Sequence, residues 1–184
     1  MTSATQVPGD PGSARLTRAI REQLRRRRAP NFSLINHQGQ PLRFYDDILK
    51  NRKVLLNVMY SGCSKICTPA TRNLLQARKL LRAQEIDLQF VSMTLTPLSD
   101  SPEVLRRYMA LHGIDPDWTY LTGKVEHVQG IQLALGFISA RKGDDLLSHS
   151  GSALYCDERN LQWSHVNTLL SPPAIARMIR FALV

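Results

Sequence analysis

Cysteine is scarce in this chain of 184 residues, and long apolar runs are missing altogether. An odd total of 3 cysteines excludes a disulfide-rich scaffold, so each cysteine has to be considered singly. No stretch approaches the ~20 consecutive apolar residues that span a bilayer, and the first residues lack the apolar core of a secretory signal. Taken as a full-length chain, the sequence predicts a soluble, cytoplasmic protein with one ordinary domain.

Aromatic residues are absent from positions 1–31, although this segment carries much of the positive charge. The net charge is +9, and residues 14–29 contribute seven arginines against the single acid Glu22. Without stacking rings, this leader lacks a feature of single-strand nucleic-acid binders, and we expect no nucleic-acid partner. The leader is either simply solvated or in contact with an anionic membrane surface, where each charge gains roughly 1 kcal/mol.

Proline and glycine divide the chain into a leader, residues 1–29, and a domain, residues 30–184. Residues 1–12 have a composition typical of disorder, and residues 13–28 could form a short basic helix that Pro30 ends. Hydrophobic patterning predicts strands at 32–35, 41–44, 54–60, 86–95, 118–121, 151–156 and 161–166, and helices at 66–83, 101–112, 125–135 and 171–181.

The order of these elements indicates an α/β fold. Strands that alternate with helices predict parallel pairing, and a hairpin near the C-terminus predicts an antiparallel edge. We therefore expect a thioredoxin-like fold with an N-terminal β-hairpin extension, in which a mixed central sheet is flanked by helices.

Two of the cysteines, Cys63 and Cys67, lie where a buried strand passes into a helix. Ligands in open α/β folds gather beyond the carboxyl ends of strands, and a spacing of four places both sulfurs on one side of a helical turn. The helix N-terminus and nearby Lys65 are expected to lower the thiol pKa values. Two converging thiolates form a soft site that selects Cu(I) or Zn(II).

Other interpretations of the cysteine pair stay open at this point. The two residues can be buried small apolar groups, or the redox dithiol of a thiol-disulfide oxidoreductase. Thioredoxin-type enzymes place two residues between their cysteines and a cis-proline opposite, whereas three residues intervene here and no proline lies between Asp117 and Pro172. A peroxiredoxin-like peroxidase using Cys67 would need proline at the position of Tyr60. A non-catalytic interaction module is the remaining alternative.

A histidine from elsewhere could complete a trigonal metal site with the two thiolates. His149 directly precedes the expected strand 151–156, which in a thioredoxin-like fold neighbours the strand that feeds the cysteine loop. His165 at a strand end is a weaker, auxiliary candidate, and Cys156 is expected to be a buried small residue. Structural roles in a turn, at a helix end and within a helix are expected for His37, His112 and His127.

Four stretches together resemble the Sco/SenC family of copper proteins, over roughly residues 30–183. They are the hairpin at 31–39, the Cys63-x3-Cys67 spacing, the segment 96–104 (TPLSDSPEV), and Ser148-His149-Ser150 before the strand at 153–155. The family serves assembly of the dinuclear copper centre of cytochrome c oxidase. The resemblance implies a metallochaperone that holds copper with Cys63, Cys67 and His149.

The same resemblance implies a partner and a compartment. The partner would be a copper-acceptor protein, either a cytochrome c oxidase subunit or another copper chaperone. The compartment would be the cell envelope, in the periplasm or at the membrane. The chain departs from the family pattern at three positions, because Thr68 precedes Pro69, Thr96 replaces an aspartate, and Ser148 replaces the aspartate before the ligand histidine. Loss of that last carboxylate would weaken or retune the site.

Overall fold

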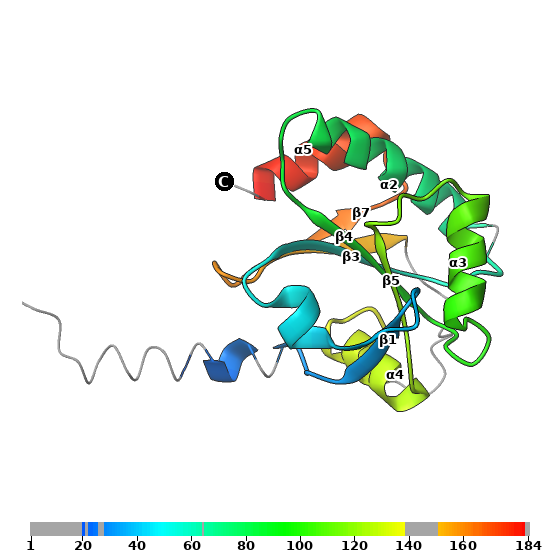
Figure 1. Ribbon diagram of the computed structural model, residues 1–184. Helices are drawn as coiled ribbons and strands as arrows, with labels where there is room; N and C mark the ends of the chain where they lie inside the picture. Colours follow the sequence, from blue (N-terminus) through cyan, green and yellow to red (C-terminus); the bar gives the residue numbers. More distant parts are fainter. Residues whose placement is uncertain (1–19, 21, 26–27, 64, 139–150, 183–184) are drawn as a thin grey trace, which may run out of the picture.

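The computed structural model describes residues 20, 22–25, 28–63, 65–138 and 151–182. Over these residues, seven strands form one sheet in the order β2-β1-β5-β4-β3-β6-β7 (Figure 1). The strands are β1 (Ser33–Asn36), β2 (Pro41–Arg43), β3 (Lys53–Met59), β4 (Gln89–Thr94), β5 (Thr119–Thr122), β6 (Ser152–Asp157) and β7 (Gln162–Asn167). The helices of the domain are η1 (Phe44–Leu49), α2 (Cys67–Arg82), α3 (Pro102–Leu111), α4 (Val125–Ala134) and α5 (Pro172–Ala182).

The sheet is mixed, as the element order predicts. β3 pairs parallel with β4, and β4 pairs parallel with β5. The N-terminal hairpin β1–β2 extends the sheet beyond β5, while the late hairpin β6–β7 forms the opposite, antiparallel edge. Each predicted strand and helix of the domain is present, with ends that differ by a few residues.

Helices cover both faces of the sheet (Figure 1). One core lies under α2, α3 and α5, and the other lies under η1 and α4. Alternate residues of β3 supply both cores, since Leu55 packs on the first face while Val54 and Leu56 pack on the second. Burial on both faces explains why this strand is a nearly continuous apolar run in the sequence.

The element that the sequence analysis missed is η1, a single wide helical turn at Phe44–Leu49. Its buried side chains include Phe44, Ile48 and Leu49, which pack in the second core. Six residues are too few to establish a helical period in a sequence pattern, so packing rather than periodicity decides this segment. Within the described ranges, no helix is both long and apolar enough to cross a membrane.

Candidate functional site

The loop between β3 and α2 brings the two cysteines together. Cys63 N donates a hydrogen bond of 3.2 Å to Tyr60 O, which closes a turn directly after β3. α2 begins at Cys67, whose backbone N donates to Cys63 Sγ at 3.3 Å. Thr68 Oγ1 adds a hydrogen bond of 3.2 Å to Cys63 O. The sulfur of the first cysteine therefore lies against the first amide of the helix that carries the second.

Both side chains are buried at the edge of the first core, with 7% of Cys63 and 3% of Cys67 exposed. Burial raises the pKa of Cys67 to about 12; a hydrogen bond to the Tyr60 backbone works in the opposite direction, and neighbouring Cys63 and Asp100 raise the pKa further. The prediction of a lowered thiol pKa is therefore wrong for Cys67. Desolvation of the thiolate outweighs the favourable helix N-terminus, and sequence spacing carries no information on that burial.

A buried carboxylate, Asp100, connects the cysteine loop to the end of β4. Ser61 donates to it through both its backbone N, at 3.3 Å, and its hydroxyl. The hydroxyls of Thr94 and Thr96 also donate to Asp100, the latter at 3.1 Å. Asp100 is fully buried, so these donors replace its water shell and fix the loop two residues before Cys63.

The sequence analysis did not identify Asp100 as a site residue. The available signal was a carboxylate just after a predicted strand, together with hydroxyl residues at the ends of two neighbouring strands. Thr96, where the family pattern usually has aspartate, is one of the donors to Asp100. A second carboxylate there could not donate, so this departure is consistent with the hydrogen-bond network of the chain.

A tyrosine lies beside the pair on its buried side. Tyr108 of α3 and Thr71 of α2 share a hydrogen bond of 3.1 Å between their hydroxyls. Burial raises the pKa of Tyr108, and the neighbouring Cys67 and Cys63 contribute to this shift. The buried side of the site thus includes the neutral hydroxyls of Thr71 and Tyr108.

The chain returns to the cysteine pair at the start of β6. Ala153 pairs with Asn57 near the end of β3. The carbonyl of Gly151 accepts hydrogen bonds from Thr168 N at 2.8 Å and Thr168 Oγ1 at 2.6 Å. Asn73 Nδ2 of α2 donates to Thr168 O at 3.1 Å. Gly151 is therefore tied, through one residue, to the helix that begins at Cys67.

The third predicted ligand, His149, lies outside the described residues. Across the ranges that the structure does describe, no group of three or more His, Cys, Asp or Glu side chains is arranged to hold a metal ion. The structure therefore brings together two of the three predicted ligands. The strand that follows His149 does pair with β3, as the sequence analysis expected.

The remaining candidates have structural surroundings. His37 Nδ1 accepts from Tyr120 N at 3.2 Å, and His127 Nδ1 lies 2.8 Å from Ser33 O. The ring of His112 at the end of α3 lies 4.3 Å from that of Tyr108, and His165 is exposed on β7. Cys156 is buried in the second core, on the opposite face of the sheet from the cysteine pair, which confirms its predicted role.

Comparison with known proteins gives a consistent result. The family model described as SCO1/SenC matches residues 21–183. The SCO2-like protein of Rickettsia felis is 27% identical over 156 residues, which cover 82% of this chain and 74% of that protein.

Solved structures agree with this match at the level of the fold. A SCO1/SenC family lipoprotein from Bacillus anthracis str. Ames is 22% identical, with a TM-score of 0.70 over 85% of this chain and 95% of that chain. ScoI from Arabidopsis thaliana, solved with copper bound, is 17% identical, with a TM-score of 0.69 over 83% and 95%. These similarities confirm the predicted thioredoxin-like α/β fold.

Proposed function

Because this chain belongs to the SCO1/SenC family, we propose that it is a copper metallochaperone whose ligands are Cys63, Cys67 and His149. The observation that carries the proposal is the convergence of the two cysteines at the start of α2, where Cys67 N lies 3.3 Å from Cys63 Sγ. Copper is the cargo of such a protein, and the copper-bound ScoI of Arabidopsis thaliana is a structural relative.

The position of Gly151 supports His149 as the third ligand. Gly151 follows His149 by two positions, and two residues of extended chain span at most about 7 Å. Gly151 itself is held beside α2 through Thr168 and Asn73. The backbone that leads to His149 therefore ends beside the helix that begins at Cys67, which supports a ligand from this segment.

The chemistry of the cysteine pair fits a soft ion. Two thiols and one imidazole favour Cu(I) over hard cations. Because burial raises the pKa of Cys67, its thiolate forms when a metal ion displaces the proton. Transfer then proceeds by ligand exchange: an acceptor thiol loses a proton as it takes the ion, and Cys63 or Cys67 regains one.

The family resemblance extends the proposal to partner and compartment. The acceptor is a copper-binding protein, either a cytochrome c oxidase subunit or another copper chaperone, and the role is assembly of the oxidase copper centre. We place this activity in the cell envelope, in keeping with the SCO1/SenC lipoprotein of Bacillus anthracis. In this proposal, residues 1–29 form a leader and residues 30–184 form the domain that carries the metal.

Anaerobic copper titration of the reduced protein tests the ligand set. We expect one copper ion per chain in the wild type, and loss of tight binding in Cys63→Ser, Cys67→Ser and His149→Ala. Cys156→Ser is the matched control for the cysteines, because Cys156 is equally buried but packs on the other face. His165→Ala is the control for the histidine, since that residue is exposed on β7.

Wild-type affinity in His149→Ala would refute the three-ligand assignment. The acceptor is tested separately, by copper transfer to a purified copper-binding domain of an oxidase subunit and by oxidase activity in cells lacking this protein. Tight copper binding without transfer would retain the metal site and reject the oxidase role.

The proximity of Cys63 and Cys67 also favours a second candidate, a thiol-disulfide oxidoreductase acting on an acceptor protein. In that reaction the two thiols become a disulfide, and the acceptor disulfide takes up the two electrons and two protons. The raised pKa of Cys67 opposes it, because the attacking species is a thiolate. Turnover on a disulfide substrate without copper binding would favour this alternative.

A further inference from the structure

A pocket of about 310 Å³ lies at the opposite end of the sheet from the cysteine loop. Glu158, which follows β6, lines this pocket, and its backbone N donates to Arg52 O just before β3 begins. The cysteine loop follows the other end of β3, a strand of 7 residues, which corresponds to about 20 Å at the usual rise of a strand. In Figure 1 the short blue helical stretch that contains residues 22–25, at lower left, and the β3–α2 turn, at right, lie on opposite sides of the molecule.

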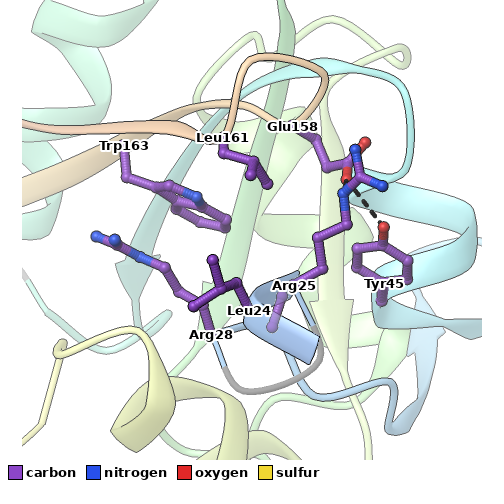
Figure 2. Close-up of a pocket in the computed structure, with 8 residues that line it drawn as sticks. Leu24, Arg25, Arg28, Tyr45, Glu158, Leu161 and Trp163 are labelled. Carbon is purple, nitrogen blue, oxygen red and sulfur yellow. Dashed lines mark hydrogen bonds and ion pairs between the residues drawn. The ribbon is translucent and has the colours of Figure 1, made fainter. Parts of the chain in front are cut away.

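Leu24, Arg25 and Arg28, near the end of the leader, line this pocket. Arg25 Nε lies 2.6 Å from Glu158 Oε1, and Tyr45 Oη donates to the same oxygen at 2.9 Å. Asn51 N donates to the other carboxylate oxygen of Glu158 at 2.8 Å. Glu158 is 2% exposed, so this contact fixes the end of the leader to the domain (Figure 2).

A second arginine from the leader, Arg28, contacts an aromatic ring, whereas Arg25 contacts a carboxylate. Arg28 lies over the ring of Trp163, with its guanidinium carbon 5.1 Å from the ring centroid. In the portion of the chain that the structure covers, no carboxylate forms an ion pair with Arg28, and its side chain is exposed. Figure 2 shows Leu24 beside Arg28 and Trp163 at the mouth of the pocket.

Apolar side chains accompany these charges. Ile20 and Leu24 are one helical turn apart and are 49% and 54% exposed. Leu161 and Trp163 are half-buried at the pocket. The surface formed by Ile20, Leu24, Arg28, Leu161 and Trp163, called the docking face below, combines exposed aliphatic groups, an indole ring and an unpaired guanidinium.

We propose that the docking face binds the surface of a bilayer that contains anionic phospholipid. Basic helices with an apolar side lie in the headgroup region of membranes, and indole rings favour the same depth. Ile20 and Leu24 enter the acyl boundary, Trp163 lies at the interface, and Arg28 contacts a lipid phosphate. The further arginines of residues 14–29 strengthen the attraction, as polybasic segments do.

This orientation has a functional consequence. The cysteine loop faces away from the membrane, about 20 Å from the bound surface by the length of β3. That separation is more than two Debye lengths at physiological salt, so lipid charge is screened at the cysteine pair. The inference does not depend on copper binding, because the docking face shares no residue with the cysteine site.

Vesicle binding by the metal-free protein tests the proposal. The probes are vesicles of phosphatidylglycerol and phosphatidylcholine in equal parts, with pure phosphatidylcholine vesicles as the comparison. We expect sedimentation with the anionic vesicles only, and a loss of about fivefold in affinity for Arg28→Gln. Leu24→Gln is expected to lose a similar factor, because it removes the aliphatic group that enters the boundary.

Matched controls come from α3, which lies on the other side of the sheet. Leu111→Gln removes a leucine that is 80% exposed, and Arg107→Gln removes an exposed arginine whose ion-pair partner, Glu103, is one turn away. Both variants should bind anionic vesicles as the wild type does. Because all these side chains are largely exposed, none of the substitutions should prevent folding.

Tryptophan fluorescence gives an independent measurement. The chain has two tryptophans, and Trp118 is fully buried, so a spectral shift on vesicle binding reports on Trp163. We expect a blue shift with the anionic vesicles, quenching by brominated lipid, and no effect of soluble glycerol phosphate.

Binding that needs Arg28 but tolerates Leu24→Gln, without a shift of Trp163, would overturn the proposal in favour of simple charge attraction. An equal response to pure phosphatidylcholine would overturn it too. A single-stranded oligonucleotide that shifts Trp163 as strongly as anionic vesicles would instead assign the surface to nucleic acid.

Discussion

Asp100 and Glu158 are both buried carboxylates, but they lie at opposite ends of the sheet and have different partners. Glu158 contacts the guanidinium of Arg25, a phenol and a backbone amide. The contacts of Asp100 are hydroxyls and the amide of Ser61. The carboxylate of Glu158 is therefore paired with a cation, whereas the carboxylate of Asp100 is surrounded by neutral donors next to the cysteines.

This difference shows how one fold separates two tasks. An ion pair at the Glu158 end attaches a basic segment to the domain. At the Asp100 end, neutral donors fix the cysteine loop. Burial keeps the thiol of Cys67 protonated, and a soft metal ion can replace its proton.

Truncation of the two networks gives the largest expected contrast. Asp100→Ala should lower the free energy of unfolding by about 3 kcal/mol, because it leaves several buried donors without a partner. Arg25→Ala should cost about 1 kcal/mol, since the arginine is 23% exposed and its ion pair is partly screened. Urea denaturation of both variants measures the contrast, and equal losses would show that the two carboxylates are supported alike.

The next largest effect is a difference in pH dependence between copper binding at the cysteine loop and vesicle binding at the docking face. With a pKa near 12, Cys67 is protonated at neutral pH. Release of its proton on copper binding should raise the copper affinity about tenfold per pH unit, or about a hundredfold between roughly pH 6 and pH 8. Vesicle binding through arginines should not change over the same range, because guanidinium stays charged.

Competition titrations with a copper chelator and vesicle sedimentation, each run across this pH range, measure the two slopes. A copper affinity that is flat with pH would mean that Cys67 is already a thiolate, contrary to the buried environment described above.

Removal of a single charge tests whether Asp100 acts on the cysteine loop. Asp100→Asn keeps the shape of the side chain but weakens its hydrogen bonds to Ser61, and should lower copper affinity about tenfold. Glu158→Gln is the matched control, since it changes the same chemical group at the far end of the sheet. An effect of similar size in both variants would indicate a loss of global stability instead of a local role.

The smallest expected effect concerns His37, which belongs to neither the Asp100 network nor the Glu158 network. Burial lowers its pKa, a hydrogen bond to Tyr120 opposes this shift, and the charge of Arg106 adds to it. The folded state thus binds this proton less readily than the unfolded state, so stability is complete above pH 6.5 and declines as pH falls through the lowered pKa. His37→Asn should reduce that decline by less than about 1 kcal/mol, as followed by thermal unfolding.

The predictable part of this protein is the part that local patterns specify. The apolar run of β3 and the Ser101-Pro102 helix start were correctly interpreted, and Ser101 Oγ does accept from Val104 N at 3.3 Å. The spacing of Cys63 and Cys67 also predicted their convergence. These features depend on a few neighbouring residues, which a sequence shows directly.

Tertiary contacts account for what was missed. The role of Asp100 depends on Ser61 and Thr94, which lie 39 and 6 residues away. The raised pKa of Cys67 depends on burial under α3, where Tyr108 closes the site. The contact of Arg25 with Glu158 joins the leader to a turn far along the chain. No local pattern contains these contacts, so the sequence alone predicted a lowered pKa for Cys67.

The most direct test of the central claim is X-ray absorption at the copper edge of the Cu(I)-loaded protein, compared with His149→Ala. The account predicts two sulfur ligands and one nitrogen ligand in the wild type, with the nitrogen lost in the variant and both sulfurs retained. An unchanged nitrogen contribution in His149→Ala would contradict it, because copper would then be held by a residue other than the one proposed.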